Sequence, residues 1–440
     1  MSDTLFPGPD AISARPTSAE ASPPPRLLRP NRQQLELRPA DLEGLLPADH
    51  RARLVWQFVE GLDLQALYAR VLAVEGHAGR PAIDPAMLLA LWLYATLQGV
   101  GSARALARLC EEHDAYRWLC GGVSVNYHTL ADFRVEPAAE LDELLTSSVA
   151  ALVATGAVKL QRVAQDGVKV RAHAGRGSFR REARLARLRA EASAQVDALK
   201  REVHDDPAAT TRRLEAARQR AARERQQRVT EALAQLPAVR ARRQRAGLKG
   251  PARVSTTDPE ARRMTMADGG VRPAFNGQFM TATNSQVIVG VALTNAGTDL
   301  GQLQPMVEQL QRRYGQCPRE VLADGGYVAL REIRALAAWG CRVYAPPKEP
   351  RGHPRARDAR RRNDEATTEW RMRMATEGAQ TIYKERAATS ECVNAAARNR
   401  GLQQLLVRGL RKGHAVLLWF ALAHNLLRAV ALRPAAAVPS

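Results

Sequence analysis

Apolar positions in the first third of the chain recur every three or four residues, which predicts helices from residue 36 to about 158. The clearest segment, 84-DPAMLLALWLYATLQ-98, places Asp84 at the helix cap and Pro85 in the first turn. After the break GVGS, a second helix is expected with Ser102 as its cap. This pair is compatible with a DNA-reading helix-turn-helix, and equally with an ordinary helical hairpin, which is the commoner structure.

The spacing of apolar residues changes in the second third of the chain. Valines alternate with polar residues in 160-LQRVAQDGVKVRAHAG-175, which predicts a strand. The segment 276-NGQFMTATNSQVIVGVALTN-295 predicts two strands joined by a turn near Asn284. A helix, a short strand ending at Leu322, a second helix and a strand over 341-CRVYAPP-347 are expected to follow. This order predicts a mixed α/β sheet.

Residues 176–250 interrupt the strand pattern with a run rich in Arg, Ala, Glu and Gln. Sparse apolar positions such as Leu185, Leu188 and Val196 predict a long helical pair or a short coiled coil, broken near HDDPAATT. The run holds 20 Lys and Arg against 9 Asp and Glu. Such a charge run is compatible with a solvated helix face, with DNA contact or with contact to a second protomer.

These patterns give the expected layout of the chain. It comprises a disordered leader over 1–35, a helical domain over 36–158, an α/β domain over 159–432 that contains the basic insertion 176–250, and a loose tail over 433–440. The leader is rich in Pro, Ser and Ala and lacks a signal-peptide pattern, and the polar stretch 348–365 predicts a loop. The longest apolar stretch, 415-AVLLWFALA-423, is too short to span a bilayer and predicts a buried helix.

Charge and cysteine content narrow the class of protein. The 440 residues carry a net charge of +20, with a pI of about 10.6, which indicates a polyanionic partner and most simply nucleic acid rather than a membrane. Five cysteines without a C-x2-C pair favour reduced thiols in a cytoplasmic protein over disulfides or a zinc site.

Familiar catalytic loops are missing from the sequence. It contains no phosphate-binding G-x4-G-K-[ST] loop, no dinucleotide-binding G-x-G-x-x-G loop and no zinc-binding H-E-x-x-H motif. Assignment as an ATPase, a dehydrogenase or a zinc protease therefore lacks support. Carboxylates at strand ends in a basic protein suit metal-assisted phosphodiester chemistry instead. A magnesium site of that kind needs about three acids from distant positions.

Two aspartates fit such a site and a third does not. Asp166 lies within a strand pattern, where an unpaired carboxylate is costly. Asp324, in 323-ADGG-326, ends a short apolar run and precedes a helix, so it is expected at the carboxyl end of a strand. Asp268 lies in a second copy, 267-ADGG-270, with no strand pattern leading in, and is predicted to be a turn residue.

The stretch 382-IYKERAATSECVNAAARNRGLQQL-405 offers the third acid, Glu391. On an α-helix Glu391, Asn394 and Arg398 would share one face. An acid flanked by an amide and a cation fits a metal ligand beside a phosphate backbone. It also fits an ordinary salt-bridged helix.

The order VAQDGVKV, VLADGGY and IYKERAATSECVNAAARNR resembles the DDE transposases of bacterial insertion sequences. The third block of that family has a tyrosine, an arginine, the catalytic glutamate and a basic residue, which match Tyr383, Arg386, Glu391 and Arg398. Four residues rather than three separate the arginine from the glutamate, and an arginine replaces the usual lysine while keeping its charge. The N-terminal blocks, the basic insertion and VSTTDPEARRMTMADGGVRPAFNGQF resemble one subgroup, so the similarity covers roughly residues 36–432.

The resemblance implies a fold and a set of site residues. The fold is a ribonuclease H-like mixed sheet with an all-helical N-terminal DNA-binding domain and a helical insertion. The implied catalytic and metal-binding residues are Asp166, Asp324 and Glu391, which would hold two Mg²⁺ (or Mn²⁺) ions. The implied DNA contacts are Tyr383, Arg386, Asn394 and Arg398.

The resemblance also implies an activity and partners. A transposase would bind the terminal inverted repeats of its element and catalyse strand cleavage and strand transfer on double-stranded DNA, as a homodimer in the synaptic complex. It would work in the bacterial cytoplasm at the nucleoid, without a nucleotide cofactor or a membrane. A catalytically inactive DNA-binding derivative and a structure-specific nuclease of the same fold remain as alternatives. His128, His173 and His424 show no ligand-spaced pair and are predicted to be structural or DNA-facing.

Overall fold

The computed structural model describes residues 41–73, 81–205, 212–347 and 364–432. The expected leader, the expected tail and most of the polar loop 348–365 lie outside the described residues, as does most of the break between the two insertion helices. The chain divides into two compact units, residues 1–41 and 42–440, and the features below belong to the second.

Helices fill the described chain before the first strand. They are α1 (Arg51–Glu60), α2 (Gln65–Tyr68), α3 (Pro85–Leu97), α4 (Ala103–Glu112), α5 (Asp114–Cys120), α6 (Tyr127–Phe133) and α7 (Ala138–Ala154). Both predicted caps are confirmed, because the Asp84 carboxylate and the Ser102 hydroxyl accept hydrogen bonds from first-turn N–H groups at 2.8 and 3.3 Å. α3 is buried on nearly every side, whereas α4 exposes Arg104 and Arg108.

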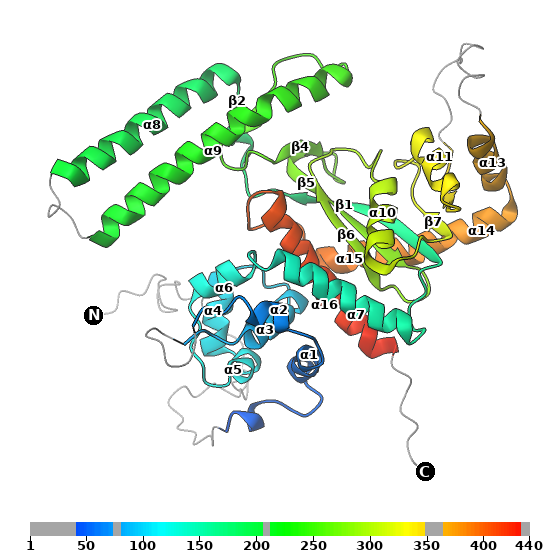
Figure 1. The fold of residues 1–440 in the computed structure, drawn as a ribbon, viewed down its shortest axis with the longest axis horizontal. Coiled ribbons are helices and arrows are strands. Elements are labelled where there is room, and N and C mark those ends of the chain that lie inside the picture. Colours follow the sequence, from blue (N-terminus) through cyan, green and yellow to red (C-terminus); the bar gives the residue numbers. More distant parts are fainter. Residues whose placement is uncertain (1–40, 74–80, 206–211, 348–363, 433–440) are drawn as a thin grey trace, which may run out of the picture. The chain divides into compact units, whose positions relative to one another are not determined.

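In the described residues, six strands form one mixed sheet (Figure 1). They are β1 (Arg162–Arg171), β4 (Arg262–Thr265), β5 (Val271–Ala282), β6 (Ile288–Thr294), β7 (Glu320–Leu322) and β8 (Arg342–Tyr344). β5 pairs antiparallel with β1 on one side and with β4 and β6 on the other, and β7 and β8 continue the sheet beyond β1 in parallel. The predicted mixed sheet is confirmed, and its strand order is consistent with a ribonuclease H-like core. β2 (Phe179–Arg180) and β3 (Val254–Ser255) form a separate pair.

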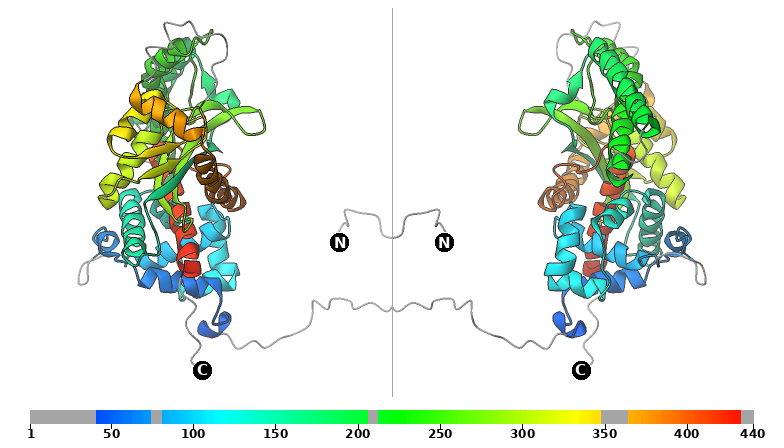
Figure 2. Two further views of the ribbon diagram at one scale, coloured as in Figure 1. Left: turned by 90° about the vertical axis from the view of Figure 1, so that its right-hand side faces the viewer. Right: turned by 90° about the vertical axis from the view of Figure 1, so that its left-hand side faces the viewer.

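Helices cover this sheet. They are α10 (Leu303–Tyr314), α11 (Leu330–Ala338), α13 (Glu365–Met374), α14 (Glu377–Arg386), the π-helix η4 (Ala387–Glu391), α15 (Cys392–Asn399) and α16 (Leu410–Leu432). α10 packs on β6 and α11 on β8, while η4 packs on β1 and β5. α16 contacts the sheet through β5 and β6 and the N-terminal helices through α3 and α7, and the two views agree on this placement (Figures 1 and 2).

α16 contains the predicted buried apolar helix. By length and composition it could cross a membrane, but 67% of its apolar window is buried inside the protein, which makes it a core helix. Its polar residues bind the β5–β6 turn: His424 contacts the Gln286 carbonyl at 2.8 Å, and Asn425 bonds both backbone groups of Ile288 at 2.8 and 2.7 Å. Arg428 donates to another turn carbonyl at 2.8 Å. The polar residues that interrupt the apolar run therefore fix the turn.

Two acids hold the beginning of α16. Asp258 accepts a hydrogen bond from the Gly409 N–H at 3.2 Å, and Glu260 accepts one from the Leu410 N–H at 2.8 Å. Carboxylates at this position satisfy free N–H groups and oppose the positive end of the helix dipole. The block VSTTDPEARR thus has a structural role in the fold.

The basic insertion is a pair of long helices, as predicted. α8 (Glu182–Asp205) and α9 (Arg212–Arg245) lie side by side (Figure 1). A small buried cluster joins this pair to β3, and its members are Leu185, Ala232, Leu236 and Val254. This cluster is separate from the main core.

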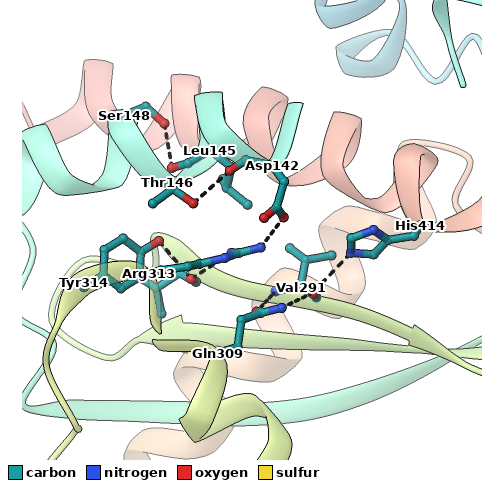
Figure 3. Close-up of polar contacts among 10 residues, drawn as sticks. Asp142, Leu145, Thr146, Ser148, Val291, Gln309, Arg313, Tyr314 and His414 are labelled. Carbon is teal, nitrogen blue, oxygen red and sulfur yellow. Dashed lines mark hydrogen bonds and ion pairs between the residues drawn. The ribbon is translucent and has the colours of Figure 1, made fainter. Parts of the chain in front are cut away.

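A polar cluster attaches α7 to the sheet (Figure 3). The Arg313 guanidinium on α10 pairs with Asp142 on α7 and also donates to the Val289 carbonyl at 3.3 Å. Tyr314 donates to the same carbonyl at 3.0 Å. The Arg313 side chain is only 7% exposed, so its charge depends on the Asp142 carboxylate for compensation.

This pair gives a first prediction. Asp142→Asn leaves the buried Arg313 charge without its carboxylate and should lower the free energy of unfolding by about 1–3 kcal/mol in urea titration. The double variant Asp142→Asn/Arg313→Met should recover part of the loss. In the exposed pair between Arg240 and Glu182, Glu182→Gln should change stability by less than about 1 kcal/mol. Equal losses of unfolding free energy in Asp142→Asn and Glu182→Gln would contradict the prediction.

His424 gives a second prediction. Burial lowers the pKa of His424 from 6.5 to about 4. Between these values the unfolded chain binds more protons than the folded protein, so stability is full above about pH 6.5 and falls as pH decreases towards about 4, by up to about 3 kcal/mol. Urea unfolding at pH 7 and pH 4.5 should show a smaller acid loss for His424→Gln. The exposed His128→Gln control should behave like the wild type, and an unchanged acid loss in His424→Gln would oppose this role.

Candidate active site

Asp166 lies on β1, and Asp324 lies two residues beyond the end of the neighbouring parallel strand β7. β1 and β7 pair with Ala164 opposite Leu322. Continuing this register by two residues sets Asp166 opposite Asp324. Because neighbouring strands lie about 4.8 Å apart, the sheet brings these two predicted residues together.

The Asp166 carboxylate is largely buried and held by three neighbours. Asn394 donates to one oxygen at 3.0 Å, the Gly167 N–H donates to the other at 2.9 Å, and the Arg386 guanidinium lies 3.5 Å away. Burial raises the pKa of Asp166 to about 6, and the nearby Asp324 carboxylate acts in the same direction. The Gly167 hydrogen bond and the Arg386 charge oppose this increase. The site therefore orients a carboxylate that is costly to ionise.

Glu391 is connected to this cluster through Arg386. The second Arg386 nitrogen lies 3.6 Å from a Glu391 oxygen, so one guanidinium bridges Asp166 and Glu391. The two residues are five apart, and η4 is a π-helix, whose i to i+5 hydrogen bonds align residues at that spacing. The Arg386 side chain is 16% exposed and lies 5.7 Å from the centre of the Tyr383 ring, whereas the Glu391 side chain is 63% exposed.

An ion-pair network fixes α14 against the sheet. Arg162 on β1 donates to Glu320 on β7 and to Glu385 on α14, both at 2.6 Å. Glu385 immediately precedes Arg386. The network therefore sets the position from which Arg386 reaches Asp166.

A buried polar layer lies behind Asp166. Side chains alternate along a strand, so Gly167 faces away from Asp166. There the Asp299 carboxylate accepts hydrogen bonds from Asn276 at 2.7 Å and from Gln278 at 2.9 Å. A β-carbon on Gly167 would lie 2.5 Å from the Asp299 oxygen, so any other residue here would displace the Asp299 carboxylate.

Tyr327 connects this layer to the site. Its hydroxyl donates to Gln278 at 2.6 Å. Burial raises the pKa of Tyr327 well above its usual value, and the carboxylates of Asp299, Asp166 and Asp324 add to the effect. Sequence reasoning missed Asp299 and this layer. The available signal was the pair of amide residues in β5, Asn276 and Gln278, both fully buried.

The described cluster fits a divalent metal ion in part. Asp166 and Asp324 are paired carboxylates of the kind that Mg²⁺ prefers. Glu391 approaches them only through Arg386, whose positive charge lies between the acids. Within the described ranges, no three Asp, Glu, His or Cys side chains are arranged to hold a metal ion. Two of the three expected ligands lie close together, and Arg386 lies between them and the third.

The remaining predicted residues of the third block differ in exposure. Asn394 was expected to share a face with Glu391 and Arg398, but its side chain is 6% exposed and points at Asp166. The predicted shared face is compatible with the structure, because Glu391 has helical dihedral angles and directly precedes the regular α-helix that carries Asn394 and Arg398. Arg398 is exposed in the last turn of α15.

Asp268 is a turn residue, as predicted. It lies between β4 and β5, accepts a hydrogen bond from the Gly270 N–H at 3.0 Å and pairs with Arg272 at 2.7 Å. The expectation that no strand leads into it is wrong, because β4 ends at Thr265. The two ADGG copies therefore differ in their surroundings: Asp324 lies beside Asp166, and Asp268 lies in an exposed hairpin turn.

Two family models match the chain. Residues 40–136 match Transposase domain (DUF772), which covers α1 to α6, and residues 341–430 match Transposase DDE domain, which covers Arg386, Glu391 and Asn394. Asp166 and Asp324 lie outside both matches. No curated protein and no solved structure matches the chain. Together with the mixed sheet and its helical surroundings, the two matches support an insertion-sequence DDE transposase, and the sheet is consistent with a ribonuclease H-like core.

Proposed function

We propose that this transposase binds the terminal inverted repeats of its element and catalyses metal-dependent strand cleavage and strand transfer. The observation that carries the proposal is the β1–β7 register, which sets Asp166 beside Asp324. The DDE domain match covers Glu391 and supports it as the third acid. DDE transposases use divalent metal ions, and the proposed ligands for two Mg²⁺ or Mn²⁺ ions are these three acids.

The protein's own residues prepare Asp166 for this role. The bound ions would activate water and then a DNA 3′-hydroxyl for in-line displacement. Asn394 and the Gly167 N–H each hold one Asp166 oxygen, so the carboxylate loses little further freedom when it takes up a ligand. We therefore assign Asn394 to the positioning of Asp166 rather than to DNA contact.

Arg386 is the residue that changes partners in this proposal. Its guanidinium compensates the charges of Asp166 and Glu391, and a phosphodiester offers two anionic oxygens that the two guanidinium nitrogens can bind together. A turn of Arg386 towards the DNA phosphate would free both acids for metal ions. The Tyr383 ring supports the guanidinium by a cation–π contact, and the exposed Arg398 is free to meet the DNA backbone.

Recognition of the element's ends is proposed for the N-terminal helices. α4 exposes Arg104 and Arg108, and the chain carries a net charge of +20. Such charges supply phosphate contacts for affinity, while base-edge contacts supply specificity. The basic pair α8 and α9 is a second candidate surface for DNA. Dimerisation on paired ends and a cytoplasmic site of action belong to the same proposal.

A third prediction compares the two ADGG aspartates. With Mg²⁺ and DNA that carries the inverted repeats, Asp324→Asn should lower the strand-cleavage rate by at least about a hundredfold, because it removes a metal ligand. Asp268→Asn, which changes an exposed turn, should retain cleavage near the wild-type rate. Cleavage is measured on denaturing gels, and DNA binding without metal should be similar for all three proteins. Equal cleavage by Asp324→Asn and the wild type would disprove the catalytic assignment.

A fourth prediction concerns Glu391. Glu391→Gln should lower cleavage by at least about a hundredfold without lowering the unfolding temperature, because the side chain is exposed and its role is metal binding. The matched control is Glu369→Gln, since Glu369 is 65% exposed and pairs with Arg373, which is 17% exposed. The control should cleave normally. Similar cleavage by both variants would remove Glu391 from the site.

A further inference from the structure

A cavity of about 370 Å³ lies between the N-terminal helices, α16 and the segment that follows α15. Trp92 of α3 and Trp419 of α16 line its apolar side. Three arginines from distant parts of the chain line its polar side: Arg134, Arg171 and Arg400. The cavity is outside the cluster around Asp166.

The charges of these arginines are not compensated by acids. In the part of the chain that the structure describes, none of the three forms an ion pair with a carboxylate. The Arg134 side chain is bonded to the Gly101 carbonyl, and its guanidinium lies 5.0 Å from the centre of the Trp92 ring. One Arg400 nitrogen is buried without a hydrogen-bond partner.

Burial makes this arrangement unfavourable without an anion. Arg134 is only 9% exposed, and burial lowers its pKa to about 10. Burial also lowers the pKa of Arg400, and the charge of Arg51 acts in the same direction. A guanidinium that is buried without an acid, as in Arg134, or that has a buried nitrogen without a partner, as in Arg400, is costly, so an anionic ligand would bind here favourably. Guanidiniums bind phosphate groups particularly well.

The cavity is tied to the strand that carries Asp166. The Arg171 N–H donates to the Gln403 carbonyl at 3.0 Å, and the Leu405 N–H donates to the Arg171 carbonyl at 2.8 Å. Arg171 is five residues beyond Asp166 on β1, which is about 16 Å along an extended strand. Each strand of duplex DNA carries a phosphate for about every 3.4 Å of helix axis, so DNA at Asp166 has further phosphates within that distance.

We propose that the cavity binds a phosphate group of a DNA strand whose neighbouring segment lies at the Asp166 cluster. The inference rests on the proposed function, because it takes DNA to be the substrate there. The cavity is too small for a duplex, so the phosphate enters from a strand end or from a strand drawn out of the duplex. Arg171, which is exposed, and Arg400 bind the phosphate directly, and Arg134 supplies a fixed positive charge behind them.

The test uses the full chain and the double variant Arg171→Met/Arg400→Met. Anisotropy of fluorescent DNA with the inverted repeats, without metal and over a range of salt concentrations, measures the affinity. The variant should bind at least about tenfold more weakly, and the slope of log K against log salt should fall by about 0.9 for each lost phosphate contact. Arg117→Met removes one charge from α5, away from the cavity, and should leave the affinity near that of the wild type.

Two further measurements separate the possible outcomes. Thermal unfolding should show the variant at or above the wild-type temperature, because the buried Arg400 nitrogen that lacks a partner is removed. A clear decrease would make the arginines structural and overturn the proposal. Inorganic phosphate should raise the unfolding temperature of the wild type more than that of the variant. A phosphate effect with unchanged DNA affinity would assign the cavity to free phosphate and overturn the DNA assignment.

The DNA-binding measurements distinguish a failure of the cavity proposal from a failure of the proposed function. If the wild type binds DNA and the variant binds it equally well, this inference fails and the proposed function stands. If the wild type binds no DNA, the proposed function fails and the DNA assignment of the cavity fails with it.

Discussion

A carboxylate in the middle of the central strand is the constraint on which the site depends. Asp166 lies near Asp324, which directly follows the neighbouring strand β7, so its negative charge is both buried and near a like charge. Such a group is tolerated only with donors and a cation around it. Asn394 and Arg386 provide them from the α14–η4–α15 segment. The electrostatics of this side chain thus add to the apolar packing of Val393 and Ala397 that holds the segment on the sheet.

The π-helix η4 brings Arg386 and Glu391 to the same side of the helix. Four residues separate Arg386 from Glu391, which on a regular α-helix would set them on different faces. The wider turn brings them to 3.6 Å, so the guanidinium reaches two acids. Arg162 holds the preceding helix through Glu385, which keeps this geometry in register with the sheet. The extra residue in the sequence motif is therefore accommodated in the backbone and does not move the glutamate out of reach.

Local patterns predicted the elements well, because caps and periodicities act over a few residues. The Asp84 cap, the β5–β6 hairpin, the helical insertion and the position of Asp324 after a short strand all followed from neighbouring residues. Long-range partners could not be predicted in this way. The contact of Asn394 with Asp166 spans 228 positions, and Asp299 lies on a loop without a motif. Residue types alone do not specify which distant side chains share a face of the sheet.

α16 joins the N-terminal helices and the sheet into one main core. Phe279 lies opposite Asp166 in the β1–β5 register and packs on Phe420 of α16, with the ring centres 5.4 Å apart. The preceding residue, Trp419, has its ring centre 6.3 Å from that of Trp92 and donates to the Arg134 carbonyl at 2.9 Å. These close-packed aromatic contacts resist movement of the N-terminal helices relative to the sheet. The arginine-lined cavity is therefore held at a fixed position relative to Asp166, as a site that binds one strand at two points requires.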